Sequence, residues 1–149
     1  MNSLKAITPI DGRYRNKVSE LEYFFSETSF NQYRIYIEIK YLIHLSKYNI
    51  INLDSEQKKV LNSIYHQFNI EEAKGLKKIE EITNHDVKAV EYYIREKLEN
   101  IDILNNKKII NHVHFGLTSQ DINSSSNVLA MKDAIIDVLI PNIKIILEH

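Results

Sequence analysis

Apolar residues recur at spacings of three and four along most of the chain, which is the period of an amphipathic helix. The segment from Phe30 to Asn49 is rich in Ile and Tyr, which also suit strands, but its length and lack of strict alternation favour a helix. The spacing predicts helices near residues 18–25, 30–49, 54–68, 71–82 and 86–99, with a last helix from about 118. The pattern therefore predicts an all-α fold.

Residues that cap helices mark several of these boundaries. Ser26–Ser29 offers a break with new caps, and Asp54 with Gln57 has the pattern of a capping box. Thr118 or Ser119 can cap the last helix, in which Pro141 predicts a kink or a restart.

Three parts of the chain do not show a complete helix with a start signal and a stop signal. Residues 1–17 have no period and contain Pro9 and the turn signal Asp11–Gly12, which predicts an extended arm. Residues 100–106 are predicted to form a loop. No stop signal follows the apolar residues after Pro141, so the last helix resembles one that has been cut.

Composition and charge exclude several classes of function. The 149 residues suffice for one domain, or for one domain and the beginning of another. Lys and Arg (19) nearly balance Asp and Glu (20), which does not favour a nucleic-acid or membrane partner. The absence of cysteine excludes disulfides, thiolate zinc sites and a cysteine nucleophile. With no apolar run of signal-peptide or membrane-span length, we expect a cytoplasmic protein.

Two polar clusters lie where helices are predicted to begin. Thr83, Asn84 and Asp86 can cap the helix that follows, and His85 between them can exchange protons near neutral pH. Free backbone N–H groups and the helix dipole attract an anion at such a position. The alternative is that the cluster only caps the helix, and that His85 is an ordinary surface histidine. Glu91 and Arg95 lie four residues apart on this helix, a spacing that predicts a solvent-facing ion pair.

The second cluster contains His112, His114, Thr118 and Ser119. Its hydroxyl and N–H groups suit a carboxylate or phosphate, and its histidines could transfer protons. On an extended segment His112 and His114 would present both rings to one side, as a zinc pair requires. No third ligand follows at zinc spacing, so no metal is predicted.

Arg13 and Tyr14 on the arm could hold a phosphate, because arginine binds phosphate bidentately and tyrosine adds a hydroxyl donor. The alternative is an arm of ordinary surface residues, which spacing alone favours.

Three motifs in order give the chain a resemblance to a known family. They are Pro9–Tyr14 with its Asp-Gly-Arg-Tyr sequence, Thr83–Glu91 with Asn-His-Asp, and His114–Asn123 with Thr-Ser-Gln-Asp-Ile-Asn. Together they resemble the N-terminal portion of the adenylosuccinate lyase family, within the fumarase and aspartase superfamily. The third motif alone would indicate only the superfamily, and argininosuccinate or aspartate-type lyases fit the first two poorly.

The resemblance implies an N-terminal helical domain over residues 1–110, with an arm over 1–17, and the incomplete start of a central helical bundle over 111–149. It implies β-elimination of fumarate from adenylosuccinate, giving AMP, and from the succinyl-aminoimidazole-carboxamide ribotide of purine synthesis. It also implies a homotetramer with shared active sites, a purine nucleotide substrate, and neither a metal nor an organic cofactor.

The resemblance also implies roles for individual residues. Arg13 and Tyr14 would grip the nucleotide phosphate. Asn84, His85 and Asp86 would line the nucleotide and succinyl site, with His85 assisting proton transfer. Thr118 and Ser119 would hold a carboxylate of the succinyl group, and His114 would face the same pocket.

The family's main acid and base are missing from this sequence. The acid is a histidine in a Thr-His-Gly-Gln motif and the base is a serine on a Gly-Ser-Ser loop, and neither motif occurs here. We therefore expect the isolated chain to be inactive. The competing interpretation is a non-catalytic helical module that binds a nucleotide or a partner. In either case, residues 119–149 should present an uncovered apolar stripe that favours self-association.

Overall fold

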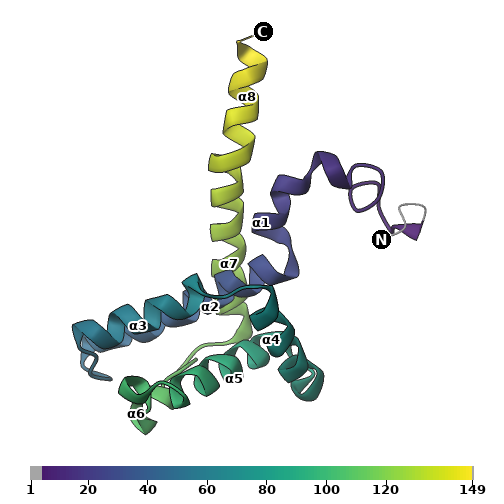
Figure 1. Ribbon diagram of the computed structural model, residues 1–149. Coiled ribbons are helices and arrows are strands. Elements are labelled where there is room, and N and C mark those ends of the chain that lie inside the picture. The colour runs from purple at the N-terminus through teal and green to yellow at the C-terminus, as the bar shows by residue number, and fades with distance from the viewer. Residues whose placement is uncertain (1–4, 149) are drawn as a thin grey trace.

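The computed structural model describes residues 5–148, and every regular element in that range is helical, which confirms the all-α prediction. Figure 1 shows a long column, α7 to α8, rising from a group of shorter helices. The elements are η2 (Arg15–Lys17), η3 (Ser19–Leu21), α1 (Glu22–Phe25), α2 (Glu27–Leu45), η4 (Ser46–Tyr48), α3 (Ser55–His66), α4 (Ile70–Thr83), α5 (Asp86–Glu99), η5 (Asp102–Leu104), α6 (Lys107–Ile110), α7 (Ser119–Ala134), the π-helix η6 (Ile135–Leu139) and α8 (Ile140–Leu147).

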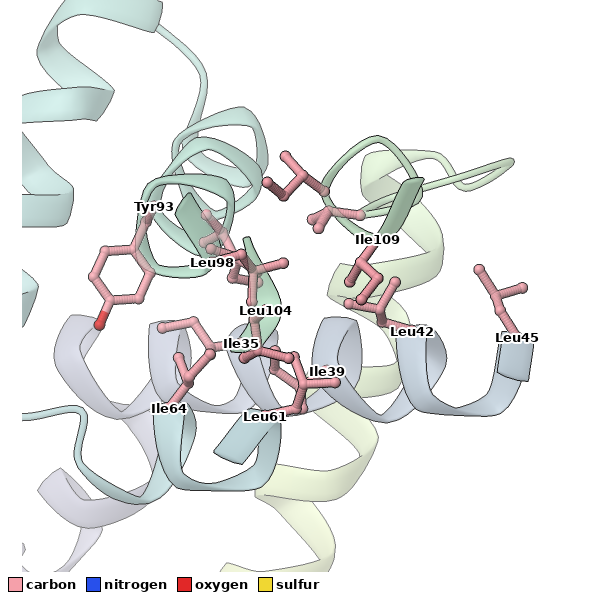
Figure 2. Packing of buried hydrophobic residues seen from close by; sticks show 14 of the residues in the cluster. Ile35, Ile39, Leu42, Leu45, Leu61, Ile64, Tyr93, Leu98, Leu104 and Ile109 are labelled. Carbon is pink, nitrogen blue, oxygen red and sulfur yellow. The ribbon is translucent and has the colours of Figure 1, made fainter. Parts of the chain in front are cut away.

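Helix α2 is the centre of the packing, since it contacts α3, α4, α5 and α7. Ile35, Ile39 and Leu42 form its buried stripe and are at most 1 % exposed. Figure 2 shows these side chains facing Leu61 of α3 and residues of α5 and η5. Burying each such side chain contributes about 1.5–3 kcal/mol relative to exposure, so this apolar cluster supplies the main stabilisation.

Two predicted helix starts are confirmed by their hydrogen bonds. The Gln57 N–H donates to Asp54 Oδ1 at 2.8 Å, and the Asp54 N–H donates to Gln57 Oε1 at 3.0 Å, which completes the capping box of α3. Ser26 caps α2, with its Oγ accepting from the Ser29 N–H at 3.2 Å. These bonds satisfy N–H groups that have no partner within the helix.

The arm is not extended as predicted. Its described part, from residue 5, consists of consecutive turns and 3₁₀ segments. The Gly12 N–H donates to the Thr8 carbonyl at 3.0 Å and the Tyr14 N–H to the Pro9 carbonyl at 2.8 Å. The turn-forming residues thus satisfy the backbone locally, and residues 1–4 of the predicted arm lie outside the described range.

The predicted interruption near Pro141 takes the form of a restart. Helix α7 passes into the π-helix η6, and α-helical bonding resumes at Ile140 with Pro141 in the first turn of α8. A proline inside a continuous helix removes a backbone hydrogen bond and crowds the preceding turn, and the wider π-turn of η6 lies directly before Pro141.

The end of the column carries an exposed apolar stripe, as the sequence predicted. No residue of α8 is buried, and the exposed fractions of Leu139, Ile143 and Ile146 are 51 %, 44 % and 73 %. None of the described helices is long and apolar enough to cross a membrane.

Candidate functional site

The Asn-His-Asp cluster forms the tight junction between α4 and α5. Asn84 adopts the left-handed conformation (φ 50°) and its N–H closes α4 by donating to the Glu80 carbonyl at 2.7 Å. His85 is the N-cap of α5, with Nδ1 accepting from the Lys88 N–H at 3.1 Å. The expectation that Thr83, Asn84 or Asp86 caps this helix is therefore wrong, because Asn84 is used to end the preceding helix.

The capping bond determines which nitrogen of His85 can meet a ligand. Since Nδ1 accepts a backbone N–H, the neutral ring carries its proton on Nε2. The His85 side chain is half exposed, and it lines a surface hollow together with Asn84, Asp86, Lys77 and Glu80. Nε2 is consequently the ring nitrogen of His85 that the helix cap does not use.

Arg34, in the middle of α2, joins the starts of two other helices. Its guanidinium donates from Nη2 to Asp86 Oδ2 of α5 at 2.5 Å and from Nε to Asn123 Oδ1 of α7 at 2.9 Å. A third bond from Nη1 reaches Asn31 at 2.9 Å, and the Arg34 side chain is only 9 % exposed. The structure thereby links the second and third sequence motifs, which are separated by residues 92–113, through a residue that belongs to neither.

Asp86 is held by two donors. Burial alone would raise the pKa of its carboxyl, but the Val87 N–H bond at 2.8 Å and the Arg34 guanidinium outweigh burial and hold the pKa below its usual value. The carboxylate is charged at neutral pH and is committed to structure, so Asp86 organises the start of α5 rather than presenting an unpaired charge.

The start of α7 carries its own carboxylate. Asp121 Oδ2 accepts from the Thr118 N–H at 2.7 Å and from Thr118 Oγ at 2.8 Å, which confirms Thr118 as the N-cap. The Thr118 backbone bond is the main cause that lowers the pKa of Asp121. Ser119 is the first residue of α7 and is half-buried, whereas Thr118 is exposed.

His114 lies in the turn before α7 and contacts α2. Its backbone has φ 62°, and its Nδ1 donates to Oε1 of Glu38, whose side chain is completely buried. The Glu38 hydrogen bond raises the pKa of His114 against the opposing effect of burial. His112 instead directs Nδ1 to the Lys108 carbonyl at 2.7 Å, so the two rings serve different partners and the segment is not extended.

Glu91 and Arg95 do form an ion pair of 2.8 Å, but the pair does not face solvent as predicted. The Glu91 side chain is 4 % exposed and also accepts from Lys88 Nζ at 2.7 Å. Packing of α5 against α2 and α7 buries this face, which the four-residue spacing alone does not reveal.

Arg13 and Tyr14 contact each other on the arm. Arg13 donates to the Tyr14 hydroxyl at 2.9 Å and its guanidinium lies 4.6 Å from the ring centroid. Both side chains are exposed, and Figure 1 shows the arm beside the column, away from α5 and α6. The structure therefore does not bring these two residues to the candidates on α5 and α7.

No group of three or more His, Cys, Asp or Glu side chains that could hold a metal occurs among residues 5–148. Sequence reasoning missed three residues of the site: Arg34, Glu38 and Asn123. The signal for the first two was a charge at the centre of an otherwise apolar helix, which requires a partner when it is buried.

Comparison with known proteins gives the family. A sequence model for a family described as lyase matches residues 12–148. Adenylosuccinate lyase of Dictyostelium discoideum is 43 % identical over 97 % of this chain and 32 % of its own length. Those of Legionella pneumophila (strain Corby) and Escherichia coli (strain K12) are 41 % and 38 % identical, over 96 % and 95 % of this chain. The chain spans about a third of the length of these relatives. On this match the chain belongs to the lyase family, and the relatives it matches are adenylosuccinate lyases.

Proposed function

We propose that this chain is the N-terminal part of an adenylosuccinate lyase, which eliminates fumarate from adenylosuccinate and from the succinyl-aminoimidazole-carboxamide ribotide. The observation that carries the proposal is the match to adenylosuccinate lyases across nearly the whole chain. The Arg34 bridge supports it, because it joins two of the three family motifs at one place in the fold.

The reaction needs a base for the succinyl carbon, an acid for the departing nitrogen and donors that hold the carboxylates. In this proposal the Nε2 of His85 assists proton transfer, and Ser119 with the N–H groups of α7 binds a succinyl carboxylate. Thr118 orders that helix start and shares the contact. Asn84 and Asp86 line the part of the substrate pocket that holds the nucleotide, and the His114 side chain faces that pocket.

The arm has a separate part in the proposal. Arg13 and Tyr14 would bind the nucleotide phosphate, and since they lie apart from α5 and α7 they would serve the pocket of another subunit. This agrees with the homotetramer and shared active sites that the family resemblance implies. We also propose a cytoplasmic location, no metal or organic cofactor, and a domain boundary near residue 110 with residues 111–149 opening the helical bundle.

The proposed function is tested with a graft. This chain replaces the matching N-terminal segment of the E. coli relative, and fumarate release from adenylosuccinate is measured. We expect the graft to be active and the isolated chain to be inactive, because the family's acid and base motifs are absent from residues 1–149. In the graft, Ser119→Ala should lower activity about tenfold or more, since it removes a hydrogen bond to a charged group.

Ser125→Ala, on the exposed side of the same helix, is the matched control and should leave the graft's activity unchanged. Fumarate release by the purified isolated chain would contradict the assignment of acid and base to other segments. A folded, inactive graft would favour the second candidate, a non-catalytic nucleotide- or partner-binding module. The observation in favour of that candidate is the uncovered apolar stripe of α8.

The same stripe predicts self-association of the isolated chain. Exposed Leu139, Ile143 and Ile146 share one helix face, so we expect light scattering to give a molar mass above that of one chain. Replacing all three by Lys should return the monomer. The double variant Ser125→Lys and Asn127→Lys adds charge on exposed positions and should still associate. A monomeric parent chain would refute the prediction.

A further inference from the structure

We propose that Glu38 is a positioning residue for His114: it holds Nδ1 so that Nε2 of the imidazole is presented beside the start of α7 as a donor to an anionic group of the substrate. The substrate part rests on the proposed function. The pairing itself rests on contacts within the described chain.

The burial of Glu38 is the first observation. Its side chain is completely inaccessible on α2, Oε1 bonds His114, and Oε2 has no hydrogen-bond partner among the described residues. A buried carboxylate costs free energy even when it is paired, and an unused acceptor adds to that cost. Replacing a whole buried pair by apolar residues is often neutral or stabilising, so stability alone does not account for a Glu38–His114 pair.

The backbone around His114 is the second observation. His114 and Gly116 both have positive φ, 62° and 71°, so the chain makes a tight turn that lifts the imidazole towards α2. Tyr41, three residues after Glu38, donates its hydroxyl to the Phe115 carbonyl at 2.9 Å. Two side chains of α2 therefore hold this turn: Glu38 bonds the His114 ring, and Tyr41 bonds the next residue's backbone.

The charges around His114 come from three helices. Glu38 of α2 and Glu91 of α5 favour the imidazolium, Lys88 of α5 opposes it, and Asp121 of α7 interacts with it. The pKa of His114 is higher in the folded chain than in the unfolded chain. The pairing therefore contributes fully to the free energy of unfolding below the ordinary histidine pKa, and this contribution is lost as the pH rises through the pKa of the folded chain. A positively charged ring beside a helix N-terminus complements a carboxylate or phosphate.

The pairing is tested by NMR on the whole chain with ¹⁵N-labelled histidine. In the parent chain, His114 should titrate above the ordinary histidine value and keep its proton on Nδ1 when neutral. Glu38→Gln preserves size and an acceptor but removes the charge, so the pKa of His114 should fall by about one unit or more. Glu71→Gln, at an exposed position of α4, is the control and should leave the titration unchanged.

An unshifted His114 pKa in Glu38→Gln, or a neutral ring protonated only on Nε2, would overturn the pairing. In the active graft, Glu38→Gln should raise KM for adenylosuccinate more than it lowers kcat, whereas a merely structural residue would lower the amount of folded enzyme. An unchanged KM would overturn the substrate part. An inactive graft counts against the proposed function, and the NMR titration still decides the pairing.

Discussion

Replacing Arg34 by methionine is expected to lower the free energy of unfolding by about 2–3 kcal/mol, since hydrogen bonds to charged groups are lost on three partners. Methionine retains much of the aliphatic volume, so the loss reports the guanidinium rather than a cavity. Asp86 of α5 and Asn123 of α7 lose their bonds to α2, and Asn31 loses its bond to Arg34 within α2. Urea unfolding at neutral pH measures the change as a lower midpoint with an unchanged slope.

Arg34→Lys separates charge from geometry. A lysine ammonium cannot reach three acceptors from one plane, so its effect should fall between those of the parent and Arg34→Met. Lys74→Met on α4 is the matched control, because Lys74 is 63 % exposed and pairs with the exposed Glu71, and it should stay within about 0.5 kcal/mol of the parent. Equal midpoints for Arg34→Met and Lys74→Met would contradict the role of Arg34.

Leu98→Ala is expected to cost about 2–5 kcal/mol, the range for truncating a fully buried leucine. Leu98 lies on α5 with no exposed surface and belongs to the same buried cluster as Leu104 and Ile39 (Figure 2). Its truncation leaves a cavity where α5 meets the chain that returns through η5. Thermal or urea unfolding monitored by circular dichroism measures the loss.

The control for Leu98→Ala is Ile82→Ala, which removes a similar side chain from a helix position that is 86 % exposed. Its effect should stay within about 0.5 kcal/mol. A comparable loss in both variants would mean that helix propensity, and not burial in the core, governs the stability of the helix pair α4 and α5.

The helices could be predicted from sequence because their signals are local. The capping box at Asp54 and the N-cap at Thr118 need only residues three apart, and both were confirmed. The cap at His85 is not predictable in this way, because Asn and Asp are the commoner caps and nothing local shows that Asn84 ends α4. The shape of the arm was wrong for a similar reason: turn signals were recognised, but not that the turns follow one another.

The interior of the site could not be predicted, because its contacts are distant in sequence. Arg34 reaches Asp86 and Asn123, and Glu38 reaches His114, across 52, 89 and 76 positions. No periodicity encodes such pairings. The sequence of α2 shows only charges within a wide apolar face, and their partners become known once α5 and α7 are packed against it.

The π-helix at Ile135–Leu139 determines which side of the column the side chains of α8 face. Before it, buried positions recur every four residues, at Ile122, Ser126, Ala130 and Ala134, and after it none is buried. A wider turn accommodates one more residue than an α-turn, which rotates the following side chains by about 100°. Deleting a single residue from this turn would swing the isoleucines of α8 to another side of the column. An insertion of one residue in an ancestral helix would thus have been enough to redirect a whole surface without altering a single side chain on it.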